Sequence, residues 1–283
     1  MLSDRKLSIG SLMRVYWGKI SITWGLTLFE TALLAALPLL IGQSIDGLLN
    51  SDWTAFLFLL GAMGALLVSG VTRRAYDTRA YGSMRVALGE AVVTQGKDQP
   101  VSTLTARLDM SRELIDFLEM EAPVVLTAAI HAFAAILILL SFHSTLAATA
   151  AGAACLALAI YGVSSRRFFN LNNGLNEQTE KQVSVLTDGS ADSLRTHLLS
   201  LRRFEVRLSD TEAIVYGLIF TALLAMLGTN LWFAATQINA SPGQIFSIVT
   251  YSYEFIESAV TLPAALQSLT RISEITARIN RSE

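Results

Sequence analysis

Cysteine and charge are the scarcest features of this sequence. One cysteine, Cys155, among 283 residues excludes an internal disulfide framework and a multi-cysteine zinc site, and we interpret it as a small apolar packing residue. Only 16% of the residues are charged, 52% are hydrophobic, and the mean hydropathy is +0.49. This is too apolar for an ordinary water-soluble domain. A net charge of −2 gives no electrostatic case for a nucleic-acid partner.

The residue constellations that many enzymes require are also missing. The sequence contains no His-Glu-x-x-His zinc motif and no Gly-x-Ser-x-Gly nucleophile turn. Its three histidines, His131, His143 and His197, are scattered along the chain. We therefore expect no catalytic residue and no metal site, and a protein that is not an enzyme.

A phosphate-binding loop is absent from these 283 residues. The pattern Gly-x-x-x-x-Gly-Lys-[Ser/Thr] cradles nucleotide phosphates, and a Gly-Lys pair occurs only at 18–19 and 96–97. Neither pair has the required first glycine or the hydroxyl residue that follows it. Because the sequence ends shortly after its last apolar run, we expect no nucleotide-binding domain and no cofactor in this chain.

Long apolar runs are what the sequence has in abundance. No charged residue occurs between Asp52 and Arg73, from 122 to 165 or from 213 to 253, and about 20 apolar residues cross a bilayer core of ~30 Å. Polar clusters divide the two longer runs and predict turns there. A further run is interrupted only by Glu30. We therefore predict six transmembrane spans, near 20–45, 53–72, 122–142, 145–165, 213–236 and 244–265.

The basic residues predict the orientation of these spans. Four of the 21 Lys and Arg residues precede span one, seven lie between spans two and three, seven between spans four and five, and three follow span six. The three opposite loops contain none. Because cytoplasmic loops carry the excess of basic residues, we expect both termini to be cytoplasmic, in the inner membrane of a bacterium.

Two segments on the cytoplasmic side, 73–121 and 166–212, are much longer than turns. Apolar and charged residues alternate in both at near-helical spacing, and helix breakers stand near their centres, at 96–100 and 188–190. Each segment therefore predicts two helical arms joined at a tip, reaching roughly 30 Å from the membrane at 1.5 Å per residue. The arms lack the apolar surface of a separate domain, so we expect them to pack on one another or on a second copy of the chain, and we predict a dimer.

Three short stretches carry a family resemblance, at 37–46 (LPLLIGQSID), 104–109 (LTARLD) and 271–275 (RISEI). With six spans and long extensions after spans two and four, the whole chain resembles the transmembrane domain of exporter-type (type I) ABC transporters, in a stand-alone form lacking a nucleotide-binding domain. The resemblance implies an all-α membrane fold in a domain-swapped homodimer. It also implies two coupling tips, with these charged residues: Lys97 and Asp98 at the first, Asp188 and Asp192 at the second.

Acidic residues inside the predicted spans are the candidate site. Glu30 lies in span one, and Glu254 and Glu257 lie three residues apart on one face of span six. A carboxylate at the centre of a membrane helix costs on the order of 2.5–3.5 kcal/mol, so such residues usually have a role. Two neighbouring carboxylates in low dielectric disfavour double ionisation. The pair can therefore exchange a proton or bind a cationic substrate, or the acids merely line a water-filled path.

Two further polar features lie in or beside the predicted spans. His131, near mid-depth in span three, fits a proton relay or a hydrogen-bonded packing group. At the inner end of span two, Arg73 and Asp77 have the spacing of an i,i+4 ion pair. We interpret this exposed pair as structural, with gating as the alternative.

Three functions are compatible with the sequence. The first is a homodimeric transporter that alternates between inward and outward openings and uses the proton gradient, which supplies about 2.3 kcal/mol per proton per 100 mV; the resemblance gives precedent in peptide importers that keep the fold without an ATPase. The second is a subunit powered by a separate ATPase chain, although the second tip has Gly189-Ser190 where the family more often has Gly-Ile. The third is a non-transporting scaffold or sensor. An acidic path favours cationic or peptide-like cargo.

Overall fold

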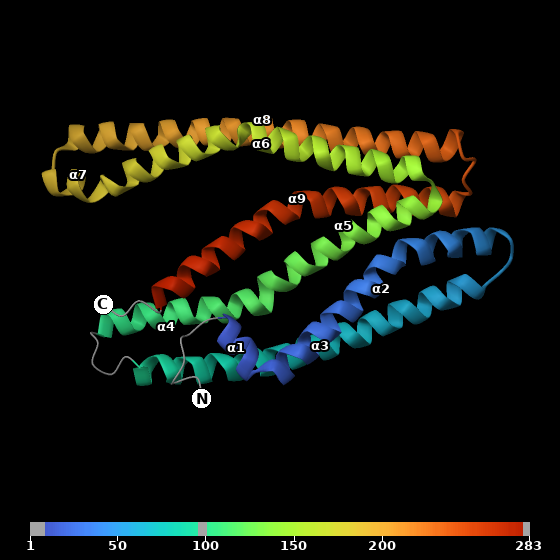
Figure 1. The fold of residues 1–283 in the computed structure, drawn as a ribbon, viewed down its shortest axis with the longest axis horizontal. Helices are drawn as coiled ribbons and strands as arrows, with labels where there is room; N and C mark the ends of the chain where they lie inside the picture. The colour runs from blue at the N-terminus through green and yellow to red at the C-terminus, as the bar shows by residue number, and fades with distance from the viewer. Residues whose placement is uncertain (1–8, 96–100, 280–283) are drawn as a thin grey trace. The chain divides into compact units, whose positions relative to one another are not determined.

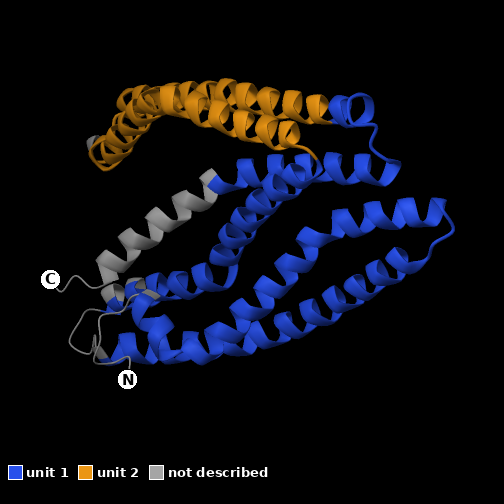
Figure 2. Cartoon of the chain, turned by 45° about the vertical axis from the view of Figure 1, so that its right-hand side comes forward, with its two compact units in different colours: residues 1–142, 231–283 blue, residues 143–230 orange. Residues whose placement is uncertain are grey.

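The computed structural model describes residues 9–95 and 101–279, and almost all of these residues are helical. The chain divides into two compact units (Figure 2), residues 1–142 with 231–283 and residues 143–230. The first unit holds α1 to α5 and α9, and the second holds α6, α7 and most of α8 (Figure 1). The helices are α1 (Ile9–Val15), α2 (Trp17–Leu49), α3 (Thr54–Gln95), α4 (Val101–Asp116), the π-helical turn η2 (Phe117–Glu121), α5 (Ala122–Phe142), α6 (Ser144–Glu180), α7 (Gln182–Asp188), α8 (Ala191–Thr236) and α9 (Pro242–Ile279).

Five helical stretches among the described residues are long and apolar enough to cross a membrane. They match the first five predicted spans, to within one residue where a span begins, and extend well beyond most of them: Trp17–Leu49, Thr54–Thr94, Arg107–Phe142, Ser144–Thr187 and Ala191–Thr236. The sixth predicted span, 244–265, lies within α9, which is not among these five. Large apolar side chains remain exposed along all five stretches, as expected of helices that face lipid. The protein is therefore an integral membrane protein built from long helices.

The breaks between helices lie close to the predicted turns. His143 separates α5 from α6, and residues 237–241 separate α8 from α9. At the second tip, Gly189 adopts a φ of +65° between α7 and α8, a conformation that glycine reaches without steric cost. The first tip, with Lys97 and Asp98, lies outside the described residues. The break at Lys181 between α6 and α7 has no helix-breaking residue and was not predicted.

The core of unit 1 lies in the arms, where α3 packs against α4. Tyr81, Met84, Leu88, Leu114 and Ile115 are all fully buried there. The Tyr81 hydroxyl donates a hydrogen bond to the carbonyl oxygen of Leu118 (3.1 Å), so the aromatic ring and its polar tip are both satisfied. The near-helical alternation of apolar and charged residues predicted within 73–121 is thus confirmed at Leu114 and Ile115.

A close seam joins α2 to α9 near the turns at 50–53 and 237–241, a part of unit 1 that we call the turn end. A Cβ atom added at Gly42 would overlap the Ser247 hydroxyl and the Gly243 carbonyl, so the two backbones approach as closely as small-residue contacts between membrane helices allow. The Ser247 hydroxyl donates to the carbonyl of Pro38 (2.9 Å), and the Tyr251 hydroxyl donates to that of Ala35 (2.7 Å). Pro38 itself lies inside an unbroken helix.

Asp46 closes this seam at the start of α9. Its carboxylate accepts a hydrogen bond from the backbone N–H of Gly243 (2.8 Å) and a second from the Ser241 hydroxyl. An acid at a helix N-terminus meets unsatisfied N–H groups and the positive end of the helix dipole. The seam is therefore held by two hydrogen bonds to the Asp46 carboxylate and two between neutral groups.

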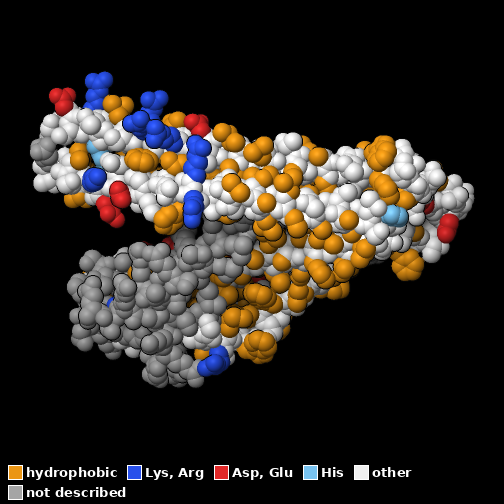
Figure 3. Space-filling model, turned by 45° about the horizontal axis from the view of Figure 1, so that its top comes forward, with side chains coloured by type: hydrophobic (Ala, Val, Ile, Leu, Met, Phe, Trp, Pro, Cys, Tyr) orange, Lys and Arg blue, Asp and Glu red, His pale blue; other side chains and the backbone are white. Residues whose placement is uncertain are grey.

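In unit 2, α6 and α8 run side by side. The Thr149 hydroxyl donates to the buried Asn230 side chain (2.5 Å), and a Cβ at Gly174 would overlap the Phe204 ring. Figure 3 shows charged side chains gathered at the α7 end of this unit and apolar ones along the rest of its visible face. Cys155 is exposed on this unit, so our interpretation of it as a packing residue was wrong for the single chain.

The seam can be tested with paired glycine substitutions in α2. We expect Gly42→Ala to lower the stability of the folded protein by about 1–3 kcal/mol, the usual cost of overpacking. Gly25→Ala is the matched control, because nothing lies within 4 Å of a Cβ added there. Thermal unfolding in detergent measures both variants, and equal melting temperatures would contradict a tight seam.

Candidate functional site

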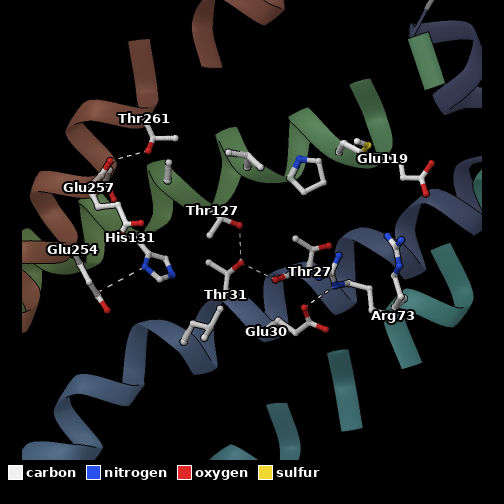
Figure 4. A pocket seen from close by; sticks show the side chains of 17 residues that line it. Thr27, Glu30, Thr31, Arg73, Glu119, Thr127, His131, Glu254, Glu257 and Thr261 are labelled. Carbon is white, nitrogen blue, oxygen red and sulfur yellow. Dashed lines mark hydrogen bonds and ion pairs between the residues drawn. The ribbon is translucent and has the colours of Figure 1, made fainter. Parts of the chain in front are cut away.

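A cavity of about 580 Å³ opens inside unit 1, between α2, α3, η2, α5 and α9 (Figure 4). Its volume is in the range of small-molecule sites. Seven of its residues are ionisable, and they include both signs of charge. The lining residues are Thr27, Glu30, Thr31, Leu34, Arg73, Arg74, Glu119, Met120, Pro123, Val124, Thr127, Ala128, His131, Glu254, Glu257, Ser258 and Thr261.

The cavity brings together the four residues predicted for substrate or proton binding. Glu30 comes from α2, His131 from α5, and Glu254 and Glu257 from α9. The predicted tip residues are elsewhere: Asp188 ends α7 and Asp192 lies in the first turn of α8, both in unit 2. The convergence of these four residues from three helices is a property of the fold, and their roles remain predictions.

Glu30 is buried and compensated by charge. Arg73 Nε donates to Glu30 Oε2 at 2.6 Å, and the Ser69 hydroxyl donates to Oε1 at 3.1 Å. Arg73 also lies 3.4 Å from Asp77, which confirms the predicted i,i+4 pair. Asp77, however, is only 4% exposed, so our description of the pair as exposed was wrong. One guanidinium thus compensates two buried carboxylates on two helices.

The other end of the cavity is acidic. His131 Nδ1 lies 3.8 Å from Glu254 Oε2, and the buried His131 Nε2 has no hydrogen-bond partner within the described ranges. Glu257 lies one helical turn further along α9 and is exposed to the cavity. No Lys or Arg side chain forms an ion pair with Glu254 or Glu257 among the residues that the structure describes. These two acids and His131 are therefore the groups best placed to exchange a proton.

Several lining residues were missed by the sequence reasoning. Glu119 and Met120 lie on η2, where the π-helical turn changes the register of the helix. Such turns are frequent at functional sites, but no residue pattern indicated this one. Glu119 is paired with Arg85, which also binds Asp116 (2.5 Å).

Threonines supply the uncharged polar groups of the lining. The hydroxyls of Thr31 and Thr127 lie 3.1 Å apart and link α2 to α5. The Thr31 hydroxyl also lies 2.8 Å from the carbonyl of Thr27, and Thr27 donates in turn to Thr23 (3.0 Å). Apolar spans carry many such hydroxyls bonded to their own helix, so spacing alone gave no signal for a cavity wall.

The chemistry available in this cavity is binding and proton exchange. Within the described ranges, no group of three or more His, Cys, Asp or Glu side chains has the geometry to hold a metal ion. Acids, hydroxyls and arginine groups are the functional groups on its walls. They can compensate the charges of a polar solute inside a membrane protein.

The Glu30 ion pair predicts an asymmetric response to mutation. Arg73→Gln leaves two buried acids without their cation, and removing one partner of a buried pair costs about 3–5 kcal/mol. Because the Arg73 side chain is 32% exposed, we expect about 2–3 kcal/mol after allowance for solvent screening. Adding Glu30→Gln to Arg73→Gln should restore part of this stability.

The control for this experiment is Arg79→Gln, because Arg79 is exposed and its guanidinium donates to the carbonyl of Ala75 (2.7 Å). Thermal unfolding in detergent compares the three variants. A similar loss at positions 73 and 79, or no recovery in the double variant, would show that the pair does not stabilise the fold.

Comparison with known proteins gives the family. A search of curated proteins found no match. The family described as ABC transporter transmembrane region matches residues 11–243, which include α2 to α8 and the start of α9. The match agrees with the long helices, the extended arms and the candidate spans found in the structure. The chain therefore belongs to the ABC transporter transmembrane region family.

Proposed function

We propose that this chain is a transporter that works as a homodimer and moves a small polar solute by alternating access. In this proposal the chain has six spans, both termini are cytoplasmic and the membrane is the inner membrane of a bacterium. These 283 residues hydrolyse no nucleotide and hold no cofactor. Family membership supports a role in transport, and the one-sided distribution of Lys and Arg supports the orientation.

The single observation that carries the proposal is the charged cavity of unit 1. Ionisable groups inside membrane helices are costly and usually belong to a transport pathway or a proton relay. Here Glu30, His131, Glu254 and Glu257 line one cavity of about 580 Å³. A scaffold that transports nothing gains no evident benefit from this arrangement.

The seam and the cavity support alternating access. On α2, the seam occupies Ala35 to Asp46, whereas the cavity is lined by residues between Thr27 and Leu34. The seam therefore closes the turn end of unit 1, and the cavity lies on the side of the arms. In the proposed orientation this is a state closed to the outside, and transport requires α2 and α9 to separate at the seam.

Exposed apolar side chains on the arms support a dimer. Val183, Leu186, Leu198 and Leu199 lie in the predicted cytoplasmic extension, and each is more than half exposed in the single chain. Lipid does not reach arms that extend beyond the bilayer, and water is a poor solvent for such side chains. A second copy of the chain would cover them.

Proton coupling is the energy source that the cavity favours. Glu254 lies 3.8 Å from His131, and no Lys or Arg neutralises it in the described part of the chain. A carboxylate and an imidazole at this separation can pass a proton between them through a small movement. Each proton that moves inward across 100 mV then supplies about 2.3 kcal/mol.

A separate ATPase chain is the second candidate energy source. Family membership favours it, because ABC transporters take their name from an ATP-binding cassette. In this version the two tips, one at Asp188 and Asp192 and the other at Lys97 and Asp98, contact the ATPase. The cavity would then bind substrate without exchanging protons.

Transport into liposomes separates the two energy sources. Purified protein is reconstituted and offered a defined mixture of amines, amino acids and short peptides, with uptake measured by mass spectrometry. We expect a pH gradient alone to drive accumulation of at least one compound, and Glu254→Gln to reduce it about 10-fold or more, within the usual range for one proton-transfer group. Glu205→Gln, at an exposed acid on α8, should have no effect. Uptake that requires an added ATPase chain and ATP would contradict proton coupling.

Alternating access predicts that a weaker seam opens more often. Asp46→Asn removes the charge from the hydrogen bonds to Gly243 and Ser241, and charge-assisted bonds are about twice as strong as neutral ones. In a Cys155→Ser background, Leu34→Cys places a thiol at the cavity. We expect Asp46→Asn to raise the rate at which an impermeant maleimide labels this thiol several-fold in right-side-out vesicles.

Asp52→Asn is the control for this labelling experiment. Asp52 lies in the turn between α2 and α3, where hydrogen bonds from the Thr54 side chain and backbone lower the pKa of its carboxyl. The hydrogen bonds that the structure describes for Asp52 join it to Thr54 and Gly47, and neither residue belongs to the seam. Equal labelling rates in the Asp46 and Asp52 variants would contradict a gate at the seam.

A further inference from the structure

Two charges on the cavity wall have no ion-pair partner within the described residues. Glu30 is paired with Arg73 and Glu119 with Arg85, and Glu254 lies near His131. This leaves Glu257 on α9 and Arg74 on α3, which are opposite in sign. Both side chains are exposed and line the cavity, so a ligand charge of opposite sign placed beside either one would be attracted to it.

These two groups lie toward opposite ends of the cavity. Figure 4 shows Glu254, Glu257 and His131 at one end, and Arg73 and Glu119 at the other. Arg74 follows Arg73 directly on α3 and lines the same cavity. One ligand that meets both unpaired groups must therefore be extended and carry opposite charges at its two ends.

The length of the cavity limits the separation of those charges. On α5 the lining runs from Pro123 to His131, and on α9 from Glu254 to Thr261. At a rise of 1.5 Å per residue these stretches span roughly 10–12 Å. An extended chain covers about 3.3–3.6 Å per residue, so a ligand as long as a tripeptide matches this distance.

The middle of the cavity suits a polar ligand backbone. The hydroxyls of Thr31 and Thr127 face each other between the two charged ends. Nearby, the buried Nε2 of His131 has no hydrogen-bond partner in the part of the chain that the structure describes. Buried polar groups are normally hydrogen-bonded, so this nitrogen points to a ligand group that is missing from the single chain.

We propose that the cavity binds a small zwitterion, with its ammonium group at Glu257, its carboxylate at Arg74 and the two charges separated by no more than about 10 Å. This inference rests on the proposed transport function and names the substrate class of the same site. A ligand with only an ammonium group leaves Arg74 uncompensated, and a ligand with only a carboxylate leaves Glu257 uncompensated. The zwitterion satisfies both.

A matched series of probes tests this assignment on the purified full chain. The probes are trialanine, its N-acetylated form, which lacks the ammonium, and its C-terminal amide, which lacks the carboxylate. Isothermal titration calorimetry in lipid nanodiscs measures each dissociation constant. We expect trialanine to bind about 10-fold more tightly than either capped form, the difference that one modest ion pair provides.

Two variants connect each end of the probe to one residue. In Glu257→Gln the advantage of trialanine over the acetylated form should disappear while its advantage over the amide remains. In Arg74→Gln the reverse should hold, so each pairing forms a double-mutant cycle between ligand and protein. Both side chains are exposed, and unchanged melting temperatures will show that the variants fold. Glu90→Gln, at an exposed acid outside the cavity lining, should behave like the native protein.

The outcomes separate this inference from the proposed function. Tighter binding of the amide than of trialanine shows that the cavity selects cations, which overturns the zwitterion and leaves the transporter intact. Equal binding of all three probes, or binding of none, also overturns it. If both variants bind trialanine more tightly than the two capped forms by the same factors as the native protein, Glu257 and Arg74 do not contact the charged groups of the ligand. Failure of transport itself is decided independently in liposomes.

Discussion

The ion pair of Glu30 with Arg73 is the interaction on which the architecture of unit 1 depends. A charge within a membrane helix is tolerated only when something compensates it. Here the compensation comes from the neighbouring helix, at 2.6 Å, and the same guanidinium reaches Asp77 at 3.4 Å. Because α2 is also the helix that packs against α3, α5 and α9, the pair fixes the helix that forms a wall of both the cavity and the seam.

The division of α2 and α9 into two parts follows from side-chain size and polarity. Toward the turn end, Gly42 and Gly243 allow backbone contact, and hydroxyls and Asp46 hold the contact with hydrogen bonds. Further along, the larger side chains of Glu30, Leu34, Glu254 and Glu257 face the space between the helices. Small residues close one end and large charged residues keep the other open, so the same two helices form a contact and a cavity.

The sequence predicted the helices well because charge-free runs and helix breakers are local signals. His143, the segment 237–241 and Gly189 all lie at predicted turns. It also identified Glu30, His131, Glu254 and Glu257, since an ionisable residue in an apolar run is visible without a structure. The sequence could not identify Arg73 as the partner of Glu30, because the two residues are 43 positions apart and only tertiary packing decides which helix faces contact each other. The cavity-lining role of Arg74 was missed for the same reason, whereas the π-helical turn at Phe117–Glu121 was missed because no residue pattern indicates it.

The pairing of charges limits where a proton can act. Glu30 and Glu119 each hold an arginine partner, so protonating either would break an ion pair and expose a cation in a poorly solvated place. Glu254 and Glu257 have no such partner among the described residues, and His131 lies beside the first of them. Protonation of Glu254 or Glu257 removes a negative charge and leaves no cation without a partner. A proton and the ammonium group of a ligand would therefore compete for the same end of the cavity. If binding of the proton displaces the ammonium group, a proton gradient could drive a zwitterion across the membrane, and this competition is the simplest physical route for such coupling.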